Sequence, residues 1–316
     1  MCMNISRRKM ILSSGLALLG AKPDIVFGIV TSTVSEEEVP FRISLNTSTI
    51  SGYNLSVEQQ IEYSSEVGFE GIELWTKDIQ VFLRRGGTYQ GLARKLQSAH
   101  LVLENIIGFS PWIIGGKGMD EMLKEMDMAA ALGSRCIAAT ALGVEKIDRN
   151  DFEKYSDNYR RILEYGMSIG VRPLLEVWGT GALNKLSDAV QIALGTGHPQ
   201  ASMLLDCYHL YRGSNSFDSL HLINGAELPL FHINDYPAVP MRTKLSDSDR
   251  VYPGDGICPF DKVLPLLYET GFRGALSLEL FNPNYWAKQD VRKTLRIGYD
   301  KLLTVITQSM SSFKPK

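Results

Sequence analysis

One phrase recurs along this chain and constrains its fold more than any other feature: a helical stretch, a glycine and a short apolar run. It occurs as EQQIEYSSEVGFEGIELW, MDMAAALGSRCIAAT, LEYGMSIGVRPLLEVWG and LLYETGFRGALSLELF. The glycines stand where each helix is expected to end, because glycine adopts the left-handed conformation of a helix C-terminus without a steric penalty; they are Gly68, Gly133, Gly170 and Gly271. The apolar runs are typical of strands buried on both faces of a parallel sheet. The phrase therefore predicts repeated helix–strand units.

The repeat predicts eight strands in all. They are expected at 41–45, 71–75, 101–106, 135–139, 172–177, 202–207, 228–233 and 274–280. Eight such units within residues 41–310 fit a single-domain (β/α)8 TIM barrel. The alternative, a doubly wound open sheet, requires a glycine-rich phosphate turn after an early strand, and no G-x-G-x-x-G follows the first one. We therefore expect a barrel with one long polar insertion, from Pro237 to Pro259.

The first forty residues have a different character. Arg7 and Arg8 precede an apolar run from Met10 to Ala21. A positive segment before a short apolar one predicts an export signal, here of the twin-arginine type, over residues 1–27. The alternative is a frayed N-terminus with a chance arginine pair. Residues 28–40 are expected to form a polar linker.

The same segment bears on where the protein acts. The apolar run is too short to span a bilayer comfortably, so we expect no stable membrane insertion after export. A working signal predicts a periplasmic protein, and a signal that does not function predicts a cytoplasmic one.

Composition excludes some classes of partner. Lys and Arg number 33 against 35 Asp and Glu, so the overall charge does not favour binding to nucleic acid. The four cysteines are widely scattered, without a CxxC pair that would indicate structural zinc or redox chemistry. The oligomeric state stays open.

Ionisable residues end the last four predicted strands: Glu176, Asp206, His232 and Glu279. The carboxyl ends of the strands form the active site of a TIM barrel. A lone glutamate at a strand end is more often a salt bridge or a helix cap. Four in succession are harder to attribute to chance, and three carboxylates around one imidazole would repel one another unless a cation is bound. The pattern predicts a divalent metal site, and its oxygen-rich donors favour Mn²⁺, with Mg²⁺, Co²⁺ or Zn²⁺ as alternatives.

Several phrases accompany these strand ends: GFEGIEL on the second strand, D-x-x-H from Asp206 to His209, HINDYP on the seventh strand, and YPGDG from Tyr252 to Gly256. With them, the chain from Phe41 to about Thr307 resembles the sugar phosphate isomerase/epimerase family of the xylose isomerase-like TIM-barrel superfamily. That family includes ketose 3-epimerases and inosose dehydratases. The resemblance is specific for the superfamily and weak for the substrate.

The resemblance implies roles for individual residues. Glu176, Asp206, His232 and Glu279 would be the metal ligands, and Glu176 and Glu279 would also act as the acid/base pair on opposite faces of a carbohydrate substrate. His209 would contact substrate oxygens. An arginine that follows the seventh strand in the family has two candidates here, because Arg242 is the first and Arg250 is an equal rival.

Such a site suits the movement of a hydrogen next to a carbonyl. A carboxylate removes the weakly acidic C–H proton, and a cation stabilises the enediolate that forms. Around this centre we expect Trp75 and Trp178 to pack on a sugar ring and Glu73 to bond a substrate hydroxyl. Asp235 is expected either to orient His232 or to begin the following loop, and we favour the first.

The leading hypothesis is therefore a metal-dependent isomerase or epimerase of a sugar or keto-sugar. A dehydratase or lyase is close behind, since it also begins by abstracting a proton beside a carbonyl. An endonuclease IV-like repair enzyme would need many histidine ligands and a basic groove, and the chain has five histidines and a formal charge of −2. A periplasmic sugar-binding barrel without catalysis would be expected to show a broken ligand set, and here all four positions are filled.

Overall fold

The computed structural model describes residues 39–311 and 313. The predicted signal at 1–27 and residues 28–38 of the predicted linker lie outside the described residues. Within the described part, no helix is long and apolar enough to cross a membrane.

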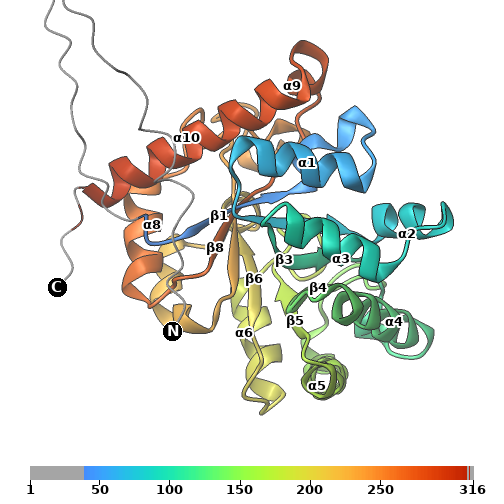
Figure 1. The fold of residues 1–316 in the computed structure, drawn as a ribbon. Coiled ribbons are helices and arrows are strands. Elements are labelled where there is room, and N and C mark those ends of the chain that lie inside the picture. The colour runs from blue at the N-terminus through green and yellow to red at the C-terminus, as the bar shows by residue number, and fades with distance from the viewer. Residues whose placement is uncertain (1–38, 312, 314–316) are drawn as a thin grey trace, which may run out of the picture. The chain divides into compact units, whose positions relative to one another are not determined.

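Eight parallel strands close into a barrel in sequence order, with β1 also paired to β8 (Figure 1). The predicted (β/α)8 TIM barrel is confirmed. Every strand lies within two residues of its predicted start and end. The strands are β1 Arg42–Asn46, β2 Gly71–Trp75, β3 Val102–Ile107, β4 Cys136–Thr140, β5 Arg172–Glu176, β6 Met203–Asp206, β7 Leu230–Ile233 and β8 Ala275–Leu278.

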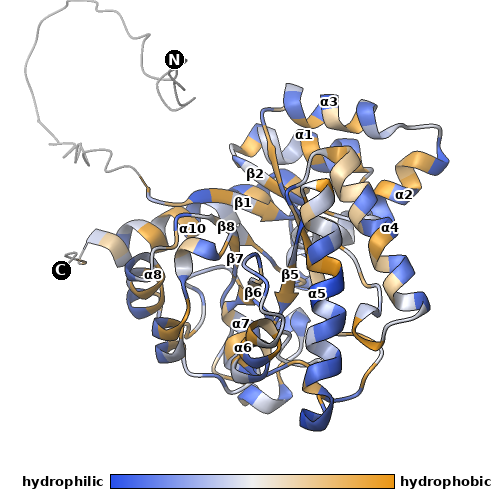
Figure 2. Cartoon of the chain, turned by 90° about the horizontal axis from the view of Figure 1, so that it is seen from below, coloured by the Kyte–Doolittle hydropathy of each residue, from blue (hydrophilic) through white to orange (hydrophobic). Residues whose placement is uncertain are grey.

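Helices surround the barrel and bury their apolar sides against it. On α5, for example, the buried residues recur at helical spacing, and its outward side is hydrophilic (Figure 2). The helices are α1 Val57–Val67, α2 Thr76–Arg84, α3 Tyr89–Ser98, α4 Lys117–Leu132, α5 Phe152–Ile169, α6 Leu186–Gly195, α7 Cys207–Arg212, α8 Phe260–Glu269, α9 Pro283–Lys288 and α10 Val291–Ser311.

The glycine stops behave as the sequence predicts. Gly68, Gly133 and Gly170 follow α1, α4 and α5 directly in the left-handed conformation, at φ 108°, 78° and 76°. Gly271 has φ 94° one residue after the cap of α8. Each chain reversal then leads into the next strand, so the repeat seen in the sequence is the physical unit of the barrel.

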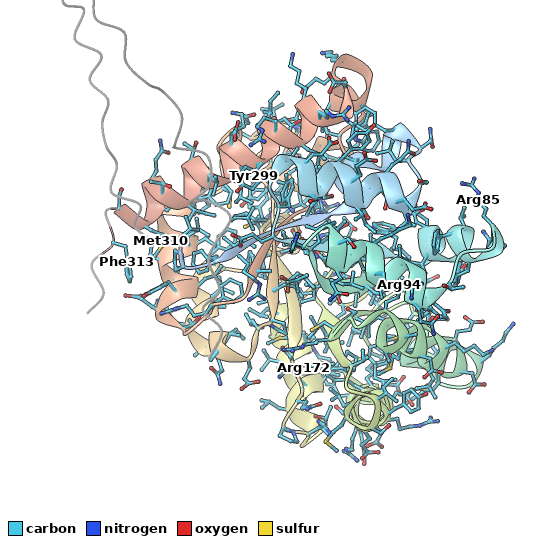
Figure 3. All side chains as sticks on the ribbon, in the orientation of Figure 1. Arg85, Arg94, Arg172, Tyr299, Met310 and Phe313 are labelled. Atoms are coloured by element: carbon cyan, nitrogen blue, oxygen red, sulfur yellow. The ribbon has the colours of Figure 1, made fainter. Side chains whose placement is uncertain are left out.

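The two ends of the barrel carry different groups. Arg172, labelled in Figure 3, begins β5 and pairs with Glu227, whereas Glu176 ends the same strand. Arg42 and Glu104 pair at 2.9 Å beside a cavity of about 960 Å³ that is lined by residues at the strand starts. The predicted site residues belong to the opposite end, where the strands finish.

The insertion from 237 to 259 contains two short 3-10 turns, Arg242–Lys244 and Asp247–Asp249, and no α-helix. It is joined to the end of β7 by a single antiparallel bridge between Asp235 and Val251. This bridge determines which part of the insertion reaches the barrel.

Candidate metal centre

Three of the four predicted ligands meet at the carboxyl end of the barrel. Asp206 ends β6, His232 lies in β7, and Glu279 follows β8. All three are buried, and each offers one ligand atom within 4.8 Å of the others. The parallel register explains this convergence, because Asp206 lies opposite His232 and the end of β7 pairs with the end of β8.

The His232 imidazole is held with one nitrogen on each side. Its Nε2 lies 3.0 Å from Glu73 Oε1, and its Nδ1 lies 3.2 Å from Glu279 Oε2 and 3.9 Å from Asp206 Oδ2. Nδ1 has no hydrogen-bond partner among residues 39–311 and 313. Burial by itself lowers the pKa of His232, but the carboxylates of Glu279 and Glu73 outweigh it and raise that pKa well above its usual value. Nδ1 faces the two other candidate ligands, and it would bind a metal there only after losing its proton.

Glu73 supports His232 and does not face a substrate. Its side chain has no exposed surface, and its carboxylate accepts hydrogen bonds from Asn105 at 2.8 Å and from the Ser277 hydroxyl in addition to its contact with His232. The geometry does not support the predicted contact with a substrate hydroxyl. A buried carboxylate behind a histidine instead fixes the tautomer and the ring orientation, as in metal sites where the second nitrogen is anchored.

The two cluster carboxylates are also positioned by neighbouring side chains. Asp206 Oδ1 accepts from the backbone N–H of His209, and Oδ2 accepts from the Asn234 amide, both at 2.7 Å. Glu279 Oε1 accepts from the Asn46 amide at 3.0 Å. Asn46 and Asn234 end or follow buried strands, so the strand-end rule that identified the ligands would also have found these two supports.

Trp75 acts through Asn46. Its indole Nε1 donates to Asn46 Oδ1 at 2.9 Å, and the Asn46 amide then bonds Glu279. The half-buried Trp75 ring also lies beside Phe109 and Phe281 at centroid distances of 5.3 and 6.1 Å. Trp75, Phe109 and Phe281 therefore form an aromatic wall next to the cluster, and its packing on a sugar ring stays a prediction.

Arg250, and not Arg242, enters the cluster. Its Nη1 donates to Glu279 Oε2 at 2.7 Å and lies 3.3 Å from Asp206 Oδ2, and its side chain is 1% exposed. Arg242 lies on the 3-10 turn of the insertion, 5.7 Å from the centre of the Tyr211 ring. Of the two rivals left open by the sequence, the structure brings only Arg250 to the site.

His209 and Trp178 lie on the side of the cluster formed by β5 and β6. His209 Nε2 is 3.0 Å from Arg250 Nη2, and its Nδ1 has no partner within the described part of the chain. Burial, together with the Arg250 charge, lowers the pKa of His209 well below its usual value, so the ring is neutral. The Trp178 ring meets it edge to face at 6.2 Å.

Asp235 does not contact His232, so the favoured role in orienting that imidazole is not supported. Its carboxylate instead accepts four backbone N–H groups of the insertion and its start, at 2.8–3.0 Å; these belong to Tyr236, Gly254, Gly256 and Cys258. A Cβ at Gly256 would lie 2.3 Å from Asp235 Oδ1, so this close approach requires glycine. Asp235 therefore holds the loop that carries Arg250.

Glu176 lies beside the three-residue cluster and is not one of its members. It is partly exposed, and its Oε2 accepts a hydrogen bond from the hydroxyl of Thr140, which ends β4. Burial raises the pKa of Glu176 to about 7, although the Thr140 hydrogen bond offsets part of this effect. A carboxylate with such a pKa takes up and releases protons near neutrality.

The residues present fit a divalent cation. The cluster offers two carboxylates and an imidazole nitrogen that lacks a hydrogen-bond partner, with Glu176 nearby as a possible fourth donor. Each ligand is also oriented by a further side chain or backbone group, which metal sites require. The mixed oxygen and nitrogen donors do not select a single metal.

Comparisons with known proteins agree with this fold. A family model described as xylose isomerase-like TIM barrel matches residues 61–297. An inosose isomerase of Halalkalibacterium halodurans is 25% identical over 269 residues, which cover 81% of this chain and 93% of the relative. A 3-dehydroshikimate dehydratase of Pseudomonas putida is 23% identical over 253 residues, which cover 77% of this chain and 38% of the relative.

Among solved structures, that of the IolI protein with a bound zinc atom superposes with a TM-score of 0.76. It is 23% identical, and the match covers 86% of this chain and all of that one. At this identity the likeness shows the shared fold.

Proposed function

This chain belongs to the xylose isomerase-like TIM-barrel family, and from that premise we propose that it is a metal-dependent isomerase or epimerase of a sugar or keto-sugar. The observation that carries the proposal is the meeting of Asp206, His232 and Glu279 at the carboxyl end of the barrel, with Glu176 beside them. The proposed reaction moves a hydrogen next to a carbonyl.

Asp206, His232 and Glu279 would hold the ion, through the carboxylates and the Nδ1 of His232. We propose Mn²⁺ as the ion, with Mg²⁺, Co²⁺ or Zn²⁺ as alternatives that the same donors accept. When bound, the cation supplies positive charge that acidifies the C–H next to the carbonyl and stabilises the enediolate.

Glu176 is the residue we assign to proton removal. It is partly exposed, its carboxylate accepts a hydrogen bond from the Thr140 hydroxyl, and its pKa of about 7 suits a general base. Glu279 differs, because Asn46 and Arg250 each donate to its carboxylate. Glu279 lies three strands from Glu176 around the barrel wall, so it is placed to act on the other face of a substrate.

The carbon that receives the proton distinguishes an isomerisation from an epimerisation. In an isomerisation, the proton removed by Glu176 returns to the neighbouring carbon. In an epimerisation, the same carbon would receive a proton on its opposite face through Glu279, which must first take that proton from solvent because His232 and Arg250 hold its pKa below the usual value. His209 and Arg250 donate hydrogen bonds to substrate oxygens in this proposal, and Trp75 and Trp178 pack against the carbon face of the ring.

A test is to incubate protein loaded with Mn²⁺ with a panel of ketoses, keto-glycosides and inososes in heavy water and to follow the products by NMR. We expect deuterium to enter one substrate next to its carbonyl without loss of water. Glu176→Gln should abolish the exchange, and prior removal of metal with a chelator should do the same. No exchange with any member of the panel, or full exchange after metal removal, would contradict the proposal.

A dehydratase is the second candidate, because a 3-dehydroshikimate dehydratase is among the relatives. The same first step would then be followed by departure of a hydroxyl on the neighbouring carbon. Product with a mass lower by one water, in the same heavy-water experiment, would favour this function over the first.

The export signal at 1–27 adds a proposal about location. If Arg7 and Arg8 direct twin-arginine export, the reaction takes place in the periplasm. Cell fractionation of the wild type and of a variant with both arginines changed to lysine tests this: the variant should remain in the cytoplasm.

A further inference from the structure

The Arg250 guanidinium occupies the same carboxylate oxygens that a bound ion would use. Nη1 lies 2.7 Å from Glu279 Oε2 and 3.3 Å from Asp206 Oδ2. These are also the carboxylate oxygens that face His232 Nδ1, at 3.2 Å for Glu279 and 3.9 Å for Asp206. Arg250 therefore sits at the centre of the cluster and not at its edge.

The other oxygens of these carboxylates are already engaged. Glu279 Oε1 accepts from Asn46, and Asp206 Oδ1 accepts from the backbone N–H of His209. An ion that binds Asp206 and Glu279 through their inner oxygens must therefore share them with a guanidinium. Two cations a few ångströms apart in a buried site repel strongly, so sharing is costly.

The contacts of Arg250 show how it can leave these oxygens without leaving the site. Its Nη2 is bonded to His209 and to Asp247, whose side chain is 34% exposed. Its Nε has no hydrogen-bond partner within the described residues. Half of the guanidinium is thus held on the outer side of the cluster, and only Nη1 reaches inward.

Aromatic rings flank the Arg250 guanidinium. Its central carbon lies 4.5 Å from the centre of the Tyr208 ring and 5.0 Å from that of Phe281. Such rings stabilise a guanidinium over their faces without fixing it at one point, unlike a second set of directional hydrogen bonds.

We propose that Arg250 is a built-in competitor of the metal: its guanidinium neutralises Asp206 and Glu279, and metal binding displaces Nη1 from them toward the outer side of the site. This inference rests on the proposed metal site. Beyond that site, the proposal couples the binding of metal to the release of an arginine that then binds substrate. Binding of the ion frees Nη1 to meet a substrate oxygen.

The test measures metal affinity and not turnover. Metal-free wild type, Arg250→Met and Arg250→Lys are titrated with Mn²⁺ by calorimetry at one pH. We expect Arg250→Met to bind at least ~10-fold more tightly, since the competing charge is removed, and Arg250→Lys to stay near the wild type. Arg242→Met is the matched control, because it removes a guanidinium from the same insertion, outside the cluster, and should not change the affinity.

Thermal melting supplies a second readout. Without metal, Arg250→Met should have a lower melting temperature than the wild type, because two buried carboxylates lose their cation. Saturating Mn²⁺ should reduce this difference in melting temperature. Equal or weaker Mn²⁺ binding by Arg250→Met, with the wild type still binding, overturns this inference and leaves the proposed metal site intact. Absence of Mn²⁺ binding to the wild type overturns both.

Discussion

Asp235 pairs with Val251 through two backbone hydrogen bonds of 3.0 and 2.9 Å, and this pairing brings the residue before Val251, Arg250, into the candidate metal-binding cluster. Asp235 precedes the insertion and Val251 lies within it, so the bridge closes a loop whose last residue is Arg250. The Asp235 carboxylate also fixes the segment that follows Val251, through the backbone N–H groups of Gly254, Gly256 and Cys258. Loop anchoring and site assembly are thus one structural feature.

Replacing Asp235 with alanine should destabilise the protein and displace Arg250. Four backbone donors lose a charged acceptor, which corresponds to about 2–4 kcal/mol of unfolding free energy. Urea denaturation measures this loss. Asp255→Ala is the control on the same insertion, because Asp255 forms an exposed pair with Lys301 and its loss should cost less than about 1 kcal/mol. Equal effects of the two substitutions would contradict the anchoring role.

Glu73→Gln should weaken metal binding by about 10–100-fold, because Glu73 orients the His232 ring without being a candidate ligand itself. Calorimetric titration with Mn²⁺ measures the change. Glu104→Gln provides the comparison, since Glu104 is also a buried carboxylate but pairs with Arg42 at the other end of the barrel. If both variants bind Mn²⁺ like the wild type, Glu73 does not position the ligand.

Glu176→Gln should separate catalysis from metal binding. We expect a loss of about 10²–10⁴-fold in the rate of solvent exchange, with Mn²⁺ affinity close to that of the wild type, because Glu176 lies outside the three-residue cluster. The deuterium-exchange rate and the Mn²⁺ titration check the two parts. Loss of metal binding in this variant would instead make Glu176 the fourth ligand, as the family resemblance implies.

Glu125 on α4 should make stability depend on pH. Burial raises the pKa of Glu125 above its usual value, an effect that the hydrogen bond from Ser110 offsets only in part. The folded state therefore favours protonated Glu125, which adds to the free energy of unfolding at low pH. This contribution is fully present below the pKa of Glu125 in the unfolded chain and is lost as the pH rises through its pKa in the folded protein.

Glutamine does not ionise, so Glu125→Gln avoids the stability that the wild type loses when Glu125 deprotonates. The free energy of unfolding of the variant minus that of the wild type should therefore increase between pH 4 and pH 8. Urea denaturation at the two pH values measures the difference. Glu121→Gln, one helical turn earlier on α4, controls for the removal of a negative charge from that helix. A relative stability of Glu125→Gln that is unchanged or falls toward pH 8 would contradict the expectation.

The barrel was predictable because each unit repeats the same local signals. A helix stop such as Gly133 and the apolar run that follows it are properties of short segments, and they do not depend on distant parts of the chain. Asp206, His232 and Glu279 were also found from their positions at strand ends, since parallel strands bring these positions to one end of the barrel.

The direction in which each side chain points, and therefore the groups that it contacts, was harder to predict. Glu73 and Asp235 stand near strand ends like the ligands, yet one lies behind His232 and the other binds the insertion. Arg242 and Arg250 could not be ranked by their distance from the seventh strand. An insertion is placed by its own bridges and turns, so sequence separation does not measure how far its residues lie from the site.

Helix stops, buried strands and strand-end residues are local signals, so the amino-acid sequence was enough to predict the eight-stranded barrel and the end at which the candidate site lies. The side-chain contacts became known only from the folded structure. Glu73 holds His232, Asp235 anchors the loop, and Arg250 reaches Asp206 and Glu279. Those contacts join residues as far as 159 positions apart. They arise from the packing of many elements together, which no short stretch of sequence contains.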